Sequence, residues 1–167
     1  MNLYFGCGKH RIKGFIGIDK IKTEAVDIIL DMNVFPYPFR NDSIEKVNLI
    51  NILEHLANTV SVMEEIWRIC KNEALVTIGV PYYNSPGAFM DPTHVSFFTE
   101  HTFDYFTEDG VTWLSEYNYY SHARFRIISI VPVQCPILNF LPKRIQWFLA
   151  HHLSTIHGLE FKLQTVK

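Results

Sequence analysis

The sequence has no strong excess of charge, few cysteines and no long apolar run. Its 167 residues contain 15 Lys and Arg against 17 Asp and Glu, which gives a net charge of −2. This balance provides no general attraction to nucleic acid or anionic lipid, so we expect neither as a partner. The only cysteines are Cys7, Cys70 and Cys135. Such an odd and sparse set predicts no disulfide framework and is typical of a reducing compartment.

Signals for membrane insertion or export are also missing. The most apolar long stretch, residues 127–141, is too short to span a bilayer and contains Pro132 and Pro136, so we expect it in the core. Met1 leads directly into a short apolar run without a basic segment, so we expect no export signal and a cytoplasmic location. With 48% hydrophobic residues and no repeats, residues 1–167 are expected to form a single domain.

Apolar runs typical of strands alternate with helical patterns, which predicts an α/β domain with a mostly parallel sheet. The spacing predicts seven strands, at residues 2–5, 15–18, 26–30, 46–50, 74–80, 125–133 and 159–166. Helices are expected from Asn58 or Thr59 to about Asn72, from Thr99 to Phe106 with Thr99 as the cap, and after Pro142. The connection from Gly8 to Gly14 is too short for the usual crossover helix, so the first helix must be reduced or absent.

Residues 81–122, after the fifth expected strand, are rich in aromatic side chains and contain His94, His101 and His122. Connections of this length in a compact domain are usually functional lids or binding loops. We therefore expect residues 81–122 to form a lid or binding loop.

Gly6-Cys7-Gly8 follows the first expected strand, and Asp19 follows the second. Three explanations fit this layout: a tight turn with a solvated carboxylate, a dinucleotide site, and an S-adenosylmethionine site. A dinucleotide fingerprint needs a third glycine where this chain has Arg11, and its acid lies about twenty residues further on. An S-adenosylmethionine site needs no third glycine, because that cofactor has no pyrophosphate. The local motif alone leaves the three explanations open.

The order of motifs along the chain resembles the class I S-adenosylmethionine-dependent methyltransferases, and in particular small bacterial members of the type 11 kind. The matching pieces are Gly6-Cys7-Gly8, Asp19, Asp31-Met32-Asn33, Pro38-Phe39, Asp42-Ser43, Leu53-Glu54-His55-Leu56 and the segment 85–94. By motif, the resemblance covers residues 2 to about 106. It implies a Rossmann-like, doubly wound, mostly parallel seven-stranded sheet, with S-adenosyl-L-methionine as cofactor and S-adenosyl-L-homocysteine as its product.

The resemblance also implies roles for residues at the strand ends. Gly6-Cys7-Gly8 would pass beneath the methionine and ribose parts of the cofactor, and Asp19 would hold the ribose hydroxyls. Asp31 and the backbone of Met32 would meet the adenine, and Asn51 or Ile50 would lie near the methionine end. Residues 81–122 would form a cap that closes over the sulfonium and binds the acceptor.

The chain departs from the family pattern at three points. Family members often carry an acidic or amide side chain where this chain has Tyr4, and a third glycine where it has His10. No helices precede the first expected strand, so we expect the cover of the site to come from residues 81–122 or from a second subunit of a homodimer.

His94 is the first candidate for a general base, with Asp91 as the group that orients its ring. The alternative is a structural turn in which His94 bonds to backbone. Glu54 and His55 lie at a strand end and are expected to line the pocket rather than to act as catalysts.

The sequence predicts no metal site. Cys7 with His10, and the pair His151-His152 with His157, offer no second Cys or His pair that would close a tetrahedral site. Lys9 and Arg11 form a small basic patch that either meets an acidic acceptor or is solvated.

These observations predict a methyltransferase that acts on an oxygen or nitrogen of a small molecule or sugar. The resemblance implies a glycan-precursor acceptor, because similar bacterial members are often associated with glycan or cell-surface biosynthesis. Two alternatives stay open: a degenerate methyltransferase-like binding module without activity, and an oxidoreductase that binds a nicotinamide or nucleotide-sugar.

Overall fold

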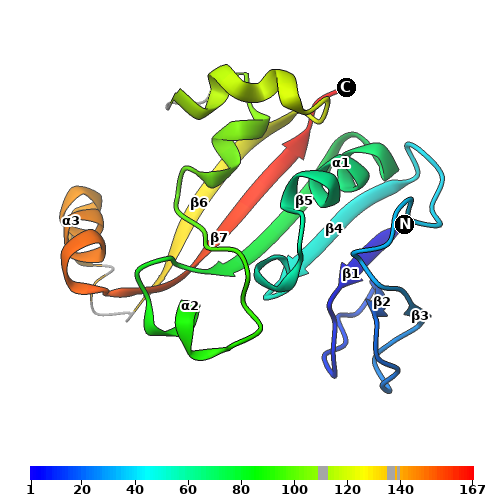
Figure 1. The fold of residues 1–167 in the computed structure, drawn as a ribbon, viewed down its shortest axis with the longest axis horizontal. Coiled ribbons are helices and arrows are strands. Elements are labelled where there is room, and N and C mark those ends of the chain that lie inside the picture. The colour runs from blue at the N-terminus through cyan, green and yellow to red at the C-terminus, as the bar shows by residue number, and fades with distance from the viewer. Residues whose placement is uncertain (109–112, 135–137, 139) are drawn as a thin grey trace.

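The computed structural model describes residues 1–108, 113–134, 138 and 140–167 (Figure 1). Seven strands form one sheet in the order β3-β2-β1-β4-β5-β7-β6. Neighbouring strands are parallel from β3 to β5, whereas β7 runs antiparallel to both β5 and β6. The structure confirms the expected α/β class and the mostly parallel, seven-stranded, Rossmann-like sheet.

The elements lie close to the expected positions. The strands are β1 (Asn2–Phe5), β2 (Ile16–Asp19), β3 (Ile28–Ile29), β4 (Ile44–Ile50), β5 (Cys70–Pro81), β6 (Phe125–Gln134) and β7 (Ile156–Thr165). The helices are α1 (Thr59–Ile69), α2 (Pro86–Met90) and α3 (Lys143–Leu153), and the 3-10 segments are η1 (Leu53–His55), η2 (Thr102–Phe106) and η3 (Trp113–Tyr120). In the described part of the chain, no helix is long and apolar enough to cross a membrane.

The helix expected at residues 99–106 is a 3-10 segment that begins later, at Thr102. Thr99 forms a turn before it, because its hydroxyl accepts from the backbone N–H of His101 at 3.2 Å and its own N–H donates to the hydroxyl of Thr102 at 2.9 Å. The expectation that Thr99 caps a helix was therefore wrong.

The main core lies between the sheet and α1. Asn58 caps α1 by accepting from the N–H of Ser61 at 3.0 Å. The buried face of α1, made of Val62, Met63, Ile66 and Ile69, packs in one cluster with buried residues of β1, β4 and β5. The ring of Phe103 in η2 extends this cluster to β7, where its centre lies 4.8 Å from that of Phe161.

Loops take the place of helices on the other face of the sheet. Tyr4, Cys7, Ala25 and Val26 form a second, smaller buried cluster beside β1 and β2. They come from β1 and from the two connections on either side of β2, and no helix is present between β1 and β4. The absence of the first crossover helix is thus confirmed. The connections around β2 cover this part of the second face, so both faces of the sheet are covered by segments that connect strands.

The rest of this second face is largely polar. Residues paired across neighbouring strands share a face, which here gives the rows Lys46-Leu75-Gln164, Asn48-Thr77-Lys162 and Ile50-Gly79-Glu160. A covering helix needs an apolar surface beneath it. The polar rows explain why β4, β5 and β7 carry helices on one face only in the described structure.

A charged clamp holds the proline-rich segment that precedes β4 against α1. The guanidinium of Arg68 donates to the carbonyls of Tyr37 and Phe39, both at 3.0 Å, and forms a two-point ion pair with Glu65. Glu65 also accepts from the backbone N–H of Tyr37 at 2.7 Å. The hydrogen bonds from Arg68 hold the pKa of the Glu65 carboxyl below its usual range, although partial burial opposes the shift.

Glu65→Gln is expected to lower the free energy of unfolding near pH 7 by about 2 kcal/mol, because hydrogen bonds to a charged group are lost. The folded-state pKa is depressed, so this stabilisation is present above the unfolded-state value and is lost as pH falls through the folded-state value. Urea unfolding from pH 7 to pH 3 should therefore show the parent and variant converging in acid. Glu24→Gln, at an exposed site, is the control. A difference that stays constant with pH would refute the role of the clamp.

The aromatic segment 81–122 is divided between the two ends of the sheet. Residues 82–97, including α2, lie near the carboxyl end of β5, whereas η3 lies at the other end beside α1 (Figure 1). The hydroxyl of Ser121 donates to the carboxylate of Glu64 in α1 at 2.9 Å. The ring centres of His122 and Trp67 lie 5.4 Å apart. Of the expected cap, only its first part is placed to cover a site at the carboxyl ends of the strands; residues 109–112 lie outside the described structure.

Candidate active site

A small hollow of about 60 Å³ lies where β1, β2, β3 and β4 end. Four of the residues predicted to bind a cofactor line it: Gly6, Asp19, Asp31 and Met32. His55, predicted to line the pocket, also lies at its wall. In parallel α/β sheets, ligands bind at this edge, near the point where the strand order reverses.

Gly6 brings the backbone close to the wall of the hollow. Its φ of +66° lies in the left-handed region that favours glycine. A Cβ atom at this position would lie 2.7 Å from the Cβ of Ile52, which also lines the hollow. Ile52 was not among the predicted site residues, because an apolar residue after a strand carries no sign of such a contact.

Asp19 holds the glycine turn and still offers acceptor capacity. One carboxylate oxygen accepts from the N–H of Gly8 at 2.9 Å, and the other accepts from the N–H of Ile21 at 3.0 Å. Each oxygen of an ionised carboxylate has a second lone pair. Asp19 can therefore accept further hydrogen bonds from hydroxyls placed in the hollow.

Asp31 and Met32 form the wall beyond β3. Asp31 is exposed and accepts from the backbone N–H of Asn33 at 2.9 Å, which fixes its carboxylate in a turn. Met32 is buried, and its carbonyl accepts from the hydroxyl of Tyr37 at 2.9 Å. Burial is the main reason why the pKa of this tyrosine is strongly raised, so the hydroxyl stays a donor.

The other predicted cofactor residues do not line the hollow. The thiol of Cys7 is buried in the second-face cluster, where burial raises its pKa. Gly8 meets the hollow only through its bond to Asp19, and Asn51, with a φ of +52°, bonds to the carbonyl of Gly79 at 2.8 Å. Tyr4, which stands where relatives often carry an acid or amide, belongs to the same cluster as Cys7.

Next to the hollow, three titratable side chains meet. The backbone carbonyl of Glu54 in η1 accepts from the N–H groups of Val95 at 2.8 Å and Ser96 at 3.2 Å. These bonds hold the loop after α2 over η1 and bring His94 to Glu54 and His55. The ring centres of His55 and His94 are 4.7 Å apart, and the side chain of His94 is only 8% exposed.

The surrounding groups orient both imidazole rings. Nδ1 of His94 lies 3.0 Å from the carbonyl of Ala88 and must donate to it. The hydroxyl of Thr93 donates to Asp91 at 2.6 Å and therefore accepts from Nδ1 of His55 at 2.9 Å. In each neutral ring, Nε2 is then the nitrogen with the free lone pair.

Asp91 thus acts mainly on His55, through Thr93. Its nearest approach to His94 is 4.0 Å, between a carboxylate oxygen and Nε2. The predicted direct orientation of His94 by Asp91 is replaced by the carbonyl of Ala88. The sequence Asp91-Pro92-Thr93 carried a signal for the missed Thr93, because an Asp often bonds to the residue two positions on.

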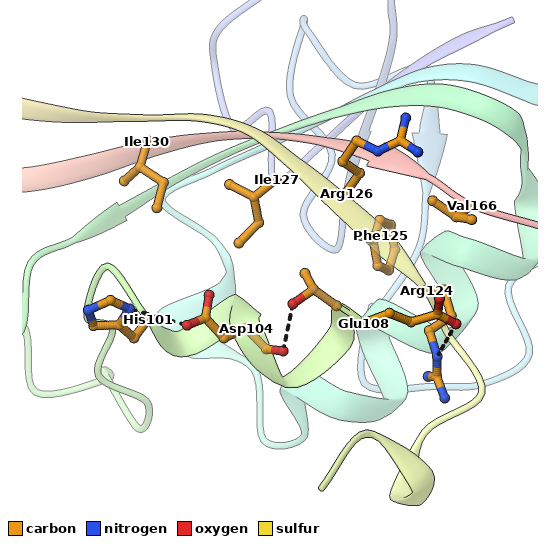
Figure 2. Close-up of a pocket in the computed structure, with 10 residues that line it drawn as sticks. His101, Asp104, Glu108, Arg124, Phe125, Arg126, Ile127, Ile130 and Val166 are labelled. Carbon is orange, nitrogen blue, oxygen red and sulfur yellow. Dashed lines mark hydrogen bonds and ion pairs between the residues drawn. The ribbon is translucent and has the colours of Figure 1, made fainter. Parts of the chain in front are cut away.

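A larger cavity of about 340 Å³ lies between η2 and β6. Figure 2 shows Ile127 and Ile130 pointing from β6 toward η2, with His101, Asp104 and Arg124 around the opening. No residue predicted to bind cofactor or to act in catalysis lines it. Four of its charged or titratable side chains pair with one another: His101 with Asp104 at 3.2 Å, and Arg124 with Glu108 at 3.9 Å.

The histidines and cysteine weighed as metal ligands in the sequence lie apart or are engaged. Cys7 is buried and His10 is exposed, while His151 is paired with Glu100 at 3.1 Å. Cys135 lies outside the described residues. Arg11 is more than half exposed and binds Asp27 at 3.0 Å and the carbonyl of Glu24 at 3.0 Å. A role of Lys9 and Arg11 toward an acidic acceptor stays a prediction.

Known structures with this architecture are numerous, although no family model and no curated protein matches the sequence. An S-adenosylmethionine-dependent methyltransferase from Archaeoglobus fulgidus superposes with a TM-score of 0.63 at 16% identity, over 98% of this chain and 85% of the other. A putative methyltransferase of Haloferax volcanii, in complex with its Trm112 activator, gives 0.60 at 13% identity, over 99% and 81%.

This chain has the methyltransferase fold. The same fold also occurs in the cyclase SpnF, which superposes with a TM-score of 0.60 at 12% identity over 99% of this chain and 74% of the other. The methyltransferase fold therefore does not by itself determine the reaction. The chemistry has to be argued from the residues at the hollow and at the Glu54–His55–His94 cluster.

Proposed function

We propose that this protein transfers a methyl group from S-adenosyl-L-methionine to an oxygen or nitrogen atom of a small-molecule or sugar acceptor. The observation that carries the proposal is the hollow, in which Gly6, Asp19, Asp31 and Met32 meet at the carboxyl ends of three neighbouring strands. Structures of the same fold that are described as S-adenosylmethionine-dependent methyltransferases, such as the one from Archaeoglobus fulgidus, support it.

The residues at the hollow suit this cofactor chemically. Asp19 has lone pairs for the two ribose hydroxyls, and the exposed Asp31 has one for the exocyclic amine of adenine. At about 60 Å³ the hollow is smaller than usual small-molecule sites, so its walls must move apart to admit the whole cofactor. When bound, the cofactor supplies an electrophilic methyl group on a sulfonium.

The loop after α2 provides the acceptor side. His94 and His55 present Nε2 lone pairs near the hollow, and His94 is placed to take a proton from the acceptor's nucleophile. Phe89 and Phe97 stack with ring centres 4.8 Å apart and are both exposed, so they offer an apolar surface beside these histidines. Much of the rate enhancement then comes from holding nucleophile and methyl carbon in line.

The setting of the reaction is inferred from the sequence. A cytoplasmic location follows from the cysteine content, and a glycan precursor as acceptor follows from the resemblance. A homodimer would supply the part of the cover that η3 does not provide, since η3 lies at the far end of the sheet.

A degenerate binding module is the second candidate. The small volume of the hollow and the burial of Tyr4 away from it favour this alternative. The oxidoreductase alternative has less support, because Arg11 is tied to Asp27 where a dinucleotide fingerprint places its third glycine.

Asp19→Asn is expected to weaken binding of S-adenosyl-L-homocysteine by about tenfold or more, because charge-assisted hydrogen bonds are worth roughly 1.5–3 kcal/mol. Isothermal titration calorimetry measures the affinity, and a thermal melt checks that the variant is folded. Asp42→Asn, at the opposite end of β4 and at a φ of +54° that Asn tolerates, is the matched control. Equal affinity of Asp19→Asn and the parent protein would contradict the ribose assignment.

A further inference from the structure

The Glu54–His55–His94 cluster has the composition of a metal site. Each residue offers one ligand atom, and the three atoms lie within 4.8 Å of one another. Ligands about 2 Å from a shared ion would be separated by roughly 3.5 Å, so small side-chain rotations close the remaining gap. The spacing along the chain hides this set, because Glu54 and His55 lie in η1 and His94 lies in the loop after α2.

The buried carboxylate of Glu54 indicates that a ligand belongs in the cluster. Glu54 is 1% exposed, and its Oε2 atom is buried without a hydrogen-bond partner among the described residues. A buried carboxylate oxygen is costly unless it is paired with a charge or coordinates a metal. In their neutral forms the two neighbouring imidazoles cannot donate to it through Nε2, because each carries its single proton on Nδ1.

Hydrogen bonds through Nδ1 already fix the two imidazoles in the way that metal-binding histidines are usually fixed. Histidines that bind a metal donate their other ring N–H to a carboxylate, a backbone carbonyl or another acceptor. His94 donates to the carbonyl of Ala88 at 3.0 Å. His55 donates to Thr93, whose hydroxyl is held in turn by Asp91. Both Nε2 lone pairs therefore remain for the ion.

We propose that Glu54, His55 and His94 bind one divalent transition-metal ion of the zinc class through a carboxylate oxygen and two imidazole Nε2 atoms. Two nitrogen ligands disfavour Mg²⁺ and Ca²⁺, which take oxygen ligands. Three protein ligands leave a coordination position open, as in catalytic rather than structural zinc sites. Because His55 also lines the hollow, this position lies beside the proposed methyl donor.

This use of the ion rests on the proposed function. The acceptor's oxygen or nitrogen takes the open position, and the ion lowers its pKa so that its proton is released to solvent. The lone pair of the acceptor's oxygen or nitrogen then forms the new bond to the methyl carbon. The bond between this carbon and the sulfur of the donor breaks, and the electron pair of the broken bond stays on sulfur. With the ion bound, His94 is a metal ligand, and the acceptor's proton goes to solvent instead of to His94.

Metal binding is measured on the full chain without cofactor. The protein is stripped with EDTA, and Zn²⁺ is then titrated in competition with a chromophoric chelator. We expect one tight Zn²⁺ per chain, no competition by Mg²⁺, and a ligand-field absorption spectrum of bound Co²⁺ typical of four or five nitrogen and oxygen ligands. Thr93→Val removes the hydroxyl that links His55 to Asp91 without removing a metal ligand, and it should weaken Zn²⁺ binding by about 10–100-fold.

Glu54→Gln and His94→Gln should each weaken binding further than Thr93→Val does, because they remove ligands. His152→Gln, at an exposed histidine outside the cluster, is the matched control and should bind as the parent does. The proposal is overturned if the parent shows no one-to-one site, or if Thr93→Val and Glu54→Gln bind Zn²⁺ as tightly as the parent. Calorimetry with S-adenosyl-L-homocysteine on the same metal-free protein reports on the proposed function separately.

Discussion

Replacing Gly17 in β2 with alanine is expected to lower the free energy of unfolding by about 3 kcal/mol or more. A Cβ atom there would lie 2.1 Å from the carbonyl oxygen of Ala25 and 3.0 Å from the sulfur of Cys7. The segment that contains Ala25 cannot simply move away from β2, because Gly17 and Asp27 exchange two hydrogen bonds of 2.8 Å. Overpacking costs about 1–3 kcal/mol, and each lost hydrogen bond adds about 1 kcal/mol.

Gly14→Ala is the matched control for this substitution. Gly14 has a φ of +84°, but no atom lies within 4 Å of a Cβ built on it, so only the backbone preference is lost. Its expected cost is about 1 kcal/mol. Urea unfolding of both variants measures the difference, and equal losses would contradict the close approach of the residue 25 backbone to β2.

Gly6→Ala is expected to abolish most of the affinity for S-adenosyl-L-homocysteine, by about tenfold or more, and to destabilise the fold by about 2–3 kcal/mol. The residue would be strained at a φ of +66° and would press on Ile52, 2.7 Å away. Ile52 leads directly into η1, so this pressure displaces the wall of the hollow that carries His55.

Gly8→Ala separates the effect of backbone strain from the effect of the contact with Ile52. Gly8 has a φ of +53°, but no atom lies within 4 Å of a Cβ built there. It should lose stability without the additional loss of affinity. Ile52→Ala removes two of the three close contacts and should partly restore binding to Gly6→Ala. If Gly6→Ala and Gly8→Ala bind the ligand equally well in calorimetry, the contact with Ile52 does not shape the site.

The strand ends were predictable from the sequence because each is marked by a change of chemistry. An apolar run followed by glycine or a carboxylate places Gly6, Asp19 and Asp31 at one edge of a parallel sheet, and the structure brings all three to the hollow. The short Gly8–Gly14 connection likewise excluded a crossover helix.

Side-chain direction and long-range assembly were not predictable in the same way. Cys7 lies between two glycines of the motif, yet its thiol is buried in the second cluster and donates to the carbonyl of Ala25 at 3.7 Å, a long-range contact that the local sequence does not reveal. The division of residues 81–122 depends on contacts of Ser121 and His122 with α1, which no local pattern reveals. The Glu54–His55–His94 cluster needs two backbone bonds between segments about 40 residues apart.

The most direct test of the central claim is a thermal melt of the parent protein with S-adenosyl-L-homocysteine and, separately, with NAD. A ligand at a hundred times its dissociation constant adds about 2.7 kcal/mol of stability. For a domain of this size, that is a rise in Tm of roughly 5–10 °C. We predict this rise with S-adenosyl-L-homocysteine and none with NAD. No rise with S-adenosyl-L-homocysteine, or a rise with NAD alone, would contradict the assignment of the hollow to a methyl-donor cofactor.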